Sequence, residues 1–194
     1  MSAKKTWQQR IRGNLDKLVL VVLLSIFMAY VLFMAVKLEP GIIPDEPAHF
    51  TFSKHYTRTL GIPEDALETY RLGWYIERNP FLFYWLNARL INLLRFIQPD
   101  ISDGALLVML RIISSIYALG TAIICYLLAG EFIQNKWWRL LPVFLLTNTL
   151  MFVFLAAGVN YDNLANLFSM AGLFFLMRVF NGKHFLNNSL AWMV

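Results

Sequence analysis

A carboxylate and an imidazole lie close together in the segment Pro44-Asp45-Glu46-Pro47-Ala48-His49-Phe50. Asp45 is a good helix N-cap and Gly61 supplies a stop, so the pattern predicts a helix over about 46–60. Residues four positions apart share one face of a helix, which places Asp45 and His49 on the same side, one turn apart. Two interpretations are open: Asp45 is a general base, or it only caps the helix beside an interfacial His49.

Further acids follow in two later segments. Tyr75-Ile76-Glu77-Arg78-Asn79-Pro80 places an acid and a base directly before an aromatic stretch that contains Tyr84, and Asp162 precedes an apolar run. Exposed charges are the default, so Glu77 and Arg78, taken alone, fit a solvated pair better than a functional site, and Asp162 could be no more than a helix cap. These groups can act together only if the fold brings the three segments to one place.

The composition indicates which kind of element must position them. Hydrophobic residues make up 58% of the 194 residues and aromatic residues 15%, against 15% charged. This is more apolar surface than a soluble domain of this size buries, so the excess must face lipid. The sequence therefore predicts an all-α integral membrane protein. Its basic residues are not interleaved with aromatic ones as in nucleic-acid binding, so we expect no nucleic-acid partner.

Four apolar stretches approach the roughly 20 residues that a spanning helix needs. We therefore expect about four transmembrane helices, at 18–36, 105–130, 140–157 and 164–180. A basic arm, 1–17, precedes the first of them. The last apolar run, 185–194, stops before it could cross a bilayer. The chain thus looks like the N-terminal part of a longer polytopic protein, ending at the start of a fifth span.

Lys and Arg determine the expected orientation, because cytoplasmic segments hold the basic excess. The arm 1–17 is basic, as are the segments near Lys136 and Arg178, whereas 160–163 has no basic residue. We therefore expect a multi-pass protein of the cell membrane with its N-terminus in the cytoplasm. The long loop 37–104 would then lie outside and carry juxtamembrane helices.

One further stretch, 81–97, is apolar enough to compete as a span. It carries four polar or charged side chains, those of Asn87, Arg89, Asn92 and Arg95. Such groups are costly at bilayer depth, so we expect this stretch to form a helix that lies at the interface. In that topology Asp45, Glu77 and Asp162 share the outer face of the membrane.

These motifs resemble the polytopic glycosyltransferases of the GT-C class, which use polyprenyl-phosphate sugars and include the protein mannosyltransferases and the lipid A aminoarabinose transferases. Such enzymes start in the cytoplasm, cross once, and open a large outer loop with an Asp-Glu motif, here Asp45-Glu46. The aminoarabinose transferases continue with an acidic-basic-Pro segment and a Tyr-Trp helix, similar to 77–80, with one inserted residue, and Tyr84-Trp85. Asp162 is similar to an Asp of their second outer loop. The string 44–50 looks closer still to a bacterial branch of the same superfamily.

The resemblance implies a GT-C fold and an inverting glycosyl transfer at the outer face. The donor would be a sugar linked to polyprenyl phosphate, and the acceptor a glycan, a lipid or a protein. Asp45 and Glu46 would be the catalytic residues, with Asp45 as the base that takes the acceptor's proton. Arg78 would bind the donor phosphate, and Glu77 would orient the phosphate or the acceptor.

The same resemblance implies that Tyr84, His49 and Asp162 bind substrate, and that the helix 81–97 guides the lipid tail into the bilayer. It also allows a divalent metal as cofactor, with Asp45, His49 and Asp162 as candidate ligands. No ligand spacing in the sequence is diagnostic of a metal.

Two other classes of protein remain open. A transporter or flippase subunit would place ionisable residues along a path through its spans, and apart from Arg111 these spans have almost none. A non-catalytic polytopic membrane protein would have no need of a helical outer loop with paired acids.

Overall fold

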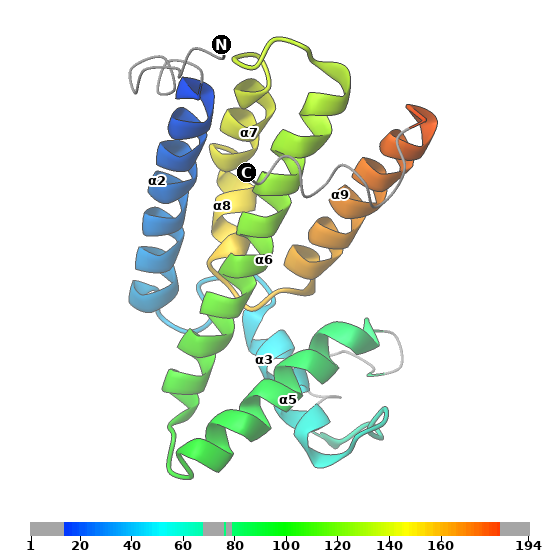
Figure 1. The fold of residues 1–194 in the computed structure, drawn as a ribbon. Coiled ribbons are helices and arrows are strands. Elements are labelled where there is room, and N and C mark those ends of the chain that lie inside the picture. The colour runs from blue at the N-terminus through cyan, green and yellow to red at the C-terminus, as the bar shows by residue number, and fades with distance from the viewer. Residues whose placement is uncertain (1–13, 68–75, 77–78, 183–194) are drawn as a thin grey trace, which may run out of the picture.

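The computed structural model describes residues 14–67, 76 and 79–182, and every regular element in this part of the chain is a helix (Figure 1). The elements are α2 (Leu15–Lys37), α3 (Glu46–His55), the 3-10 helix η1 (Tyr56–Arg58), α5 (Phe81–Ile97), α6 (Asp103–Phe132), α7 (Leu140–Thr147), α8 (Leu150–Ala156) and α9 (Tyr161–Phe180). The all-helical class expected from the sequence is confirmed for these residues.

In the described part of the chain three helices, α2, α6 and α9, are long and apolar enough to cross a membrane. Each extends up to three residues beyond the apolar run predicted for it, because polar residues continue or cap the helix. Ser102 accepts a hydrogen bond from the Ala105 N–H at the start of α6, at 3.2 Å. Asn160 accepts one from the Asp162 N–H at the start of α9, at 2.8 Å.

The stretch 140–157 was predicted as one continuous helix, and the continuity is wrong. It forms two short helices, α7 and α8, stacked end to end beside α2 and α6 (Figure 1). The break falls where three consecutive polar side chains donate hydrogen bonds to carbonyls of the preceding turn, which lets them compete with the backbone ladder. These donors are Thr147 to Val143, Asn148 to Phe144, and Thr149 to Leu145, at 2.8, 2.7 and 2.8 Å.

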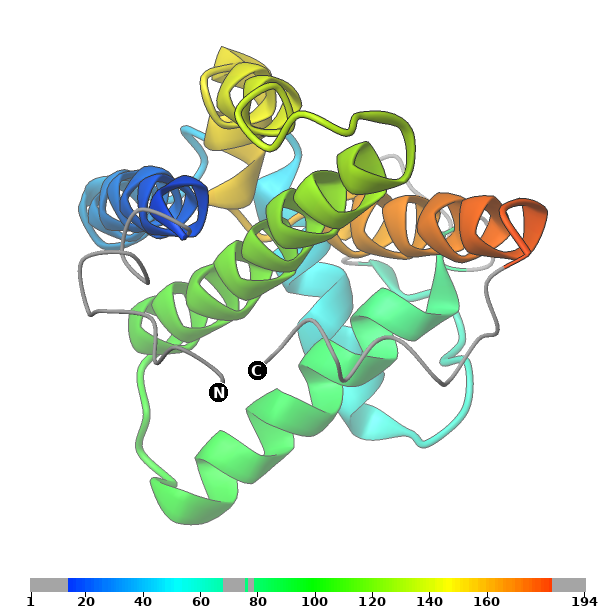
Figure 2. The same ribbon diagram turned by 45° about the horizontal axis from the view of Figure 1, so that its top comes forward.

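Helix α6 lies at the centre of the bundle, between α2 on one side and α9 on the other (Figure 2). Small residues on α6 let its neighbours approach closely. At Gly120 an added Cβ would lie only 2.9 Å from Leu167 Cδ1 of α9. Farther along α6, Ala122 and Cys125 pack with Leu24 of α2 and Val143 of α7.

The helices α3 and α5 cover one end of the bundle, and α5 lies inclined to the long axis of α2 and α6 (Figures 1 and 2). Helix α5 has the bounds predicted for it, 81–97. The preceding helix was predicted to reach residue 60 but ends at His55 and continues as the short turn η1. Arg89 of α5 explains the early end, because its guanidinium donates to the Tyr56 and Thr59 carbonyls at 2.8 Å each.

Candidate functional site

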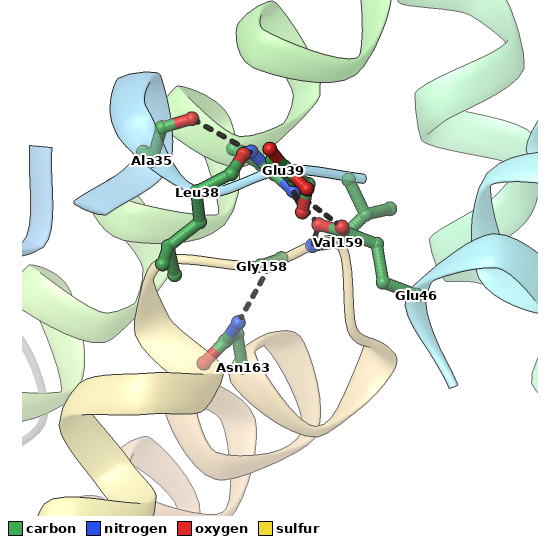
Figure 3. Close-up of polar contacts among 8 residues, drawn as sticks. Ala35, Leu38, Glu39, Glu46, Gly158, Val159 and Asn163 are labelled. Atoms are coloured by element: carbon green, nitrogen blue, oxygen red, sulfur yellow. Dashed lines mark hydrogen bonds and ion pairs between the residues drawn. The ribbon is translucent and has the colours of Figure 1, made fainter. Parts of the chain in front are cut away.

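The end of the bundle where α2 and α8 finish and α3 and α9 begin, called here the site end, is organised around Arg111 of α6. Its guanidinium donates to both oxygens of the Glu46 carboxylate, at 2.8 Å from Nε to Oε1 and 2.5 Å from Nη2 to Oε2. Three backbone carbonyls at the end of α2 accept its remaining hydrogen bonds, and Figure 3 shows the residues that carry them close to Glu46. They belong to Ala35, Leu38 and Glu39, at 3.0, 2.7 and 3.4 Å.

Glu46 is therefore anchored inside the protein rather than presented to a substrate. Its side chain is 1% exposed, and Oε1 also accepts a hydrogen bond from the backbone N–H of Val159, at 3.1 Å. A buried charge is tolerated only when it is paired and hydrogen-bonded, and both conditions hold for Glu46 and for Arg111. Arg111 thus joins α2, α3, α6 and the segment before α9, and it does not line a path through the bundle.

Asp45, the neighbour of Glu46, has the opposite environment. Its side chain is exposed and makes no hydrogen bond or ion pair with the described residues. Asp45 occupies the N-cap position of α3, as predicted, but its carboxylate makes no cap bond, and the backbone there is left-handed, with φ 59° and ψ −1°. Asp45 is the one non-glycine residue with positive φ in the described part of the chain. Such conformations concentrate at functional sites.

His49 lies one turn along α3 from Asp45, buried between aromatic rings. Its Nδ1 shares a 2.8 Å hydrogen bond with the Tyr84 hydroxyl of α5, and its ring meets Tyr161 of α9 edge to face at 5.1 Å between centroids. Burial lowers the pKa of His49 to about 4, although the charges of Asp45 and Glu46 oppose the shift. The imidazole is therefore neutral at pH 7.

Tyr84 is fully buried and links His49 to the segment before α5. Burial raises the pKa of its hydroxyl, and the nearby Tyr161, Tyr56, Asp162 and Asp45 raise it further. The phenol is therefore protonated at neutral pH, and it donates a long hydrogen bond to Asn79 Oδ1, at 3.4 Å. This arrangement makes Tyr84 and His49 a neutral polar pair rather than a charged one.

Asp162 of α9 completes the cluster from the other side. It is half-buried and lies close enough to Asp45 for the two negative charges to interact. The same loop carries Gly158, where an added Cβ would lie 2.6 Å from Ile43 Cγ2. Only glycine permits this approach, so Gly158 brings the segment before Asp162 directly against the turn that carries Asp45.

The structure thus brings together five of the residues singled out in the sequence: Asp45, Glu46, His49, Tyr84 and Asp162. Glu77 and Arg78 lie outside the described residues. Among the residues that the structure describes, no group of three or more His, Cys, Asp or Glu side chains is arranged to hold a metal ion. The candidate ligands Asp45, His49 and Asp162 are neighbours without forming such a group.

An apolar groove of about 450 Å³ lies at the far end of α5 from Tyr84. It runs between the last turn of α5 and the first turns of α6. Its lining residues are Leu94, Ile97, Gln98, Ile101, Gly104, Ala105, Val108 and Met109.

Comparisons with known proteins assign no family. No family model, no curated protein and no solved structure matches the chain. The site itself combines two carboxylates close enough to interact, one of them exposed and without a partner among the described residues, with a neutral His-Tyr pair.

Sequence reasoning missed the role of Arg111 and the place of Tyr161. Arg111 carries a usable signal, because a charged residue inside an apolar span is costly and is kept only with a partner or a function. Nothing in the sequence singles out Glu46 as that partner, which lies 65 positions away. Tyr161 carries no signal of its own, since aromatic residues are common throughout this chain.

Proposed function

We propose that this chain carries the acceptor-activating site of a membrane glycosyltransferase of the GT-C kind. The enzyme transfers a sugar from a polyprenyl-phosphate-linked donor to an acceptor at the outer face of the cell membrane. The observation that carries the proposal is the environment of Asp45. Its carboxylate is exposed, unpaired among the described residues, held in a left-handed turn, and close enough to Asp162 for the two charges to interact.

In this reaction Asp45 accepts the proton of an acceptor hydroxyl, and the acceptor oxygen attacks the anomeric carbon of the sugar. The bond between that carbon and the donor phosphate breaks, and its electron pair leaves with the polyprenyl phosphate. The sugar configuration is inverted. The base for this step must be accessible to an acceptor that approaches from the solvent. The exposed carboxylate of Asp45 meets this requirement and the buried carboxylate of Glu46 does not.

The remaining roles follow from position. Asp162 lies on the acceptor side. His49 and Tyr84, which the resemblance assigns to substrate binding, are buried and support this side as a neutral hydrogen-bonded pair. Arg78 binds the donor phosphate and Glu77 orients the phosphate or the acceptor, as the sequence resemblance implies. The lipid tail follows α5 toward the apolar groove at its end.

The proposal includes a topology of four crossings, in which α7 and α8 together make the third and the N-terminus is cytoplasmic. Cysteine substitutions at Glu64 and Asn135, made with Cys125→Ser, test it in intact cells. An impermeant maleimide should label position 64 and spare position 135, and a glycosylation acceptor placed at residue 101 should be modified. The reverse labelling pattern overturns the topology.

Asp45→Asn tests the function directly. Asn adopts the left-handed conformation as readily as Asp, and no cap bond is lost because Asp45 makes none. In the full-length protein, reconstituted with a panel of polyprenyl-phosphate sugars, transfer should fall about a hundredfold or more with the melting temperature unchanged. Asp100→Asn, on the exposed loop before α6, is the control and should transfer normally. Near-normal transfer by Asp45→Asn would show that Asp45 is not the base.

A further inference from the structure

The turn that carries Asp45 has a conformation that its own sequence disfavours. Positive φ is uncommon for a non-glycine residue, although Asp adopts it more readily than most, and Asp45 has φ 59°. Glu46 begins α3 even though the following Pro47 disfavours helical geometry at the residue before it. Two local preferences are therefore overruled within two residues. Contacts with distant parts of the chain must hold the turn.

Two such contacts flank Asp45. On one side Ile43 is completely buried and packs against Gly158, where the space is too small for even a Cβ. On the other side the Glu46 carboxylate is gripped by Arg111 and by the Val159 N–H. Figure 3 shows Glu46, Gly158 and Val159 converging at this point. Because Ile43 and Glu46 are both held in place, the backbone between them, which includes Asp45, has little freedom.

The same contacts determine where Asp162 lies. Gly158 and Val159, which touch the two flanks of the Asp45 turn, lead directly to Asn160, the residue that caps α9. The next residues are Tyr161 and Asp162. The Arg111–Glu46 pair therefore connects the positions of the two carboxylates: Glu46 bonds to Val159 on one side and adjoins Asp45 on the other.

We infer that Glu46 and Arg111 are positioning residues, whose ion pair holds Asp45 in register with Asp162. This inference rests on the proposed function of Asp45 and assigns Glu46 a part that needs no contact with substrate. The bidentate geometry matters as well as the charge, because it fixes the direction of the Glu46 side chain and so the start of α3. The Arg111 guanidinium is itself held in place, because carbonyls at the end of α2 accept hydrogen bonds from its Nη1 group.

A set of four variants tests the inference by separating stability from catalysis. Glu46→Gln and Arg111→Gln each leave one buried charge unpaired, so the melting temperature should fall by roughly 5 °C or more. The double variant removes both charges and should regain most of that loss. Its kcat should nevertheless stay about tenfold or more below wild type, with KM for the donor changed less than about twofold, because Asp45 is misplaced. Lys54→Gln is the matched control, since it breaks an exposed ion pair between the same two helices.

If Glu46 and Arg111 only stabilise the fold, the kcat of the double variant should return to the wild-type value together with its melting temperature. That result would overturn the inference. Should the neutral variants fail to express, Arg111→Lys replaces them. It keeps the charge without the bidentate geometry, and the same fall in kcat with KM unchanged is expected.

A readout independent of transfer distinguishes failure of this inference from failure of the proposed function. With Cys125→Ser, the thiol of an Asp45→Cys variant reports the local geometry through its rate of reaction with a maleimide. Adding the Glu46 and Arg111 substitutions should change that rate about threefold or more, and Lys54→Gln should not. An unchanged rate overturns the positioning role. A changed rate, combined with normal transfer by Asp45→Asn, retains the positioning role and removes the assignment of Asp45 as base.

Discussion

The site end and the middle of the helix bundle are held together by different forces. At the site end, Arg111 and Glu46 form a buried ion pair with four further hydrogen-bonding partners, three carbonyls at the end of α2 and the Val159 N–H before α9. Toward the other end, Leu24, Ala122, Cys125 and Val143 pack as an apolar cluster of small and medium side chains. The polar contacts at the site end fix the orientation of side chains, whereas the apolar contacts in the middle of the bundle fix the distances between helices.

This difference has a physical basis. Hydrogen bonds and ion pairs depend on angle, so they fix the orientation of a group, whereas dispersion contacts between small residues mainly set how closely helices approach. A site that must place one carboxylate beside another benefits from the former. The polar contacts also carry a larger penalty when one partner is lost, because a buried group is then left unsatisfied. The two regions should therefore respond differently to substitution.

The largest expected effect comes from removing one member of the buried pair. Arg111→Met leaves Glu46 charged, buried and unpaired, and should lower the free energy of unfolding by about 3–5 kcal/mol. Arg95→Met removes an exposed, longer contact with Asp103, at 3.7 Å, and should change it by no more than about 0.5 kcal/mol. Unfolding in detergent measures both. Equal effects of the two substitutions would show that the buried ion pair contributes no more to stability than the exposed one.

A pH effect of intermediate size should arise at His49. Its pKa is 6.5 in a model peptide and about 4 in the folded protein, so the unfolded chain binds this proton first as the pH falls. The stability associated with neutral His49 is therefore complete above pH 6.5 and is lost progressively toward pH 4, by about 3 kcal/mol. Unfolding curves of wild type and His49→Gln over this range should differ in slope. Parallel curves would mean that His49 is protonated as easily in the folded state.

The smallest expected effects distinguish two glycines. Gly158→Ala forces a Cβ to within 2.6 Å of the buried Ile43 and should cost about 1–3 kcal/mol, with reduced transfer because the Asp45 turn moves. Gly120→Ala in the bundle meets only the end of Leu167, at 2.9 Å, and gains helix propensity, so its net effect should stay within about 1 kcal/mol. Gly172→Ala, which meets nothing within 4 Å, is the control. A larger loss at Gly120 than at Gly158 would reverse the ranking of the two regions.

The long helices were predictable because each is encoded by a local pattern. Runs of apolar residues bounded by charges mark α2, α6 and α9 to within three residues, and an apolar stretch with interspersed polar residues marks α5. The stretch 140–157 shows the limit of such patterns. Its hydropathy is continuous, but Thr147, Asn148 and Thr149 turn to their own backbone and break the helix. Hydropathy does not report that competition.

The candidate site was predictable in part for a similar reason. The spacing of Asp45 and His49 predicts a shared helix face, and the topology argument predicts that Asp162 returns to the same side of the membrane. The environment of each carboxylate was not predictable. Adjacent acids in a motif look alike in sequence, yet Glu46 is buried against Arg111 whereas Asp45 is exposed.

The sequence by itself therefore determined the class of protein, the places of its long helices and the short segments that carry polar chemistry, because hydrophobic runs and helix signals act over a few neighbouring residues. Only the tertiary structure decided that Asp45 adopts a left-handed turn and that Glu46 pairs with Arg111. Partners 65 residues apart meet through the packing of whole helices, and a strained turn persists only where such packing holds both of its flanks.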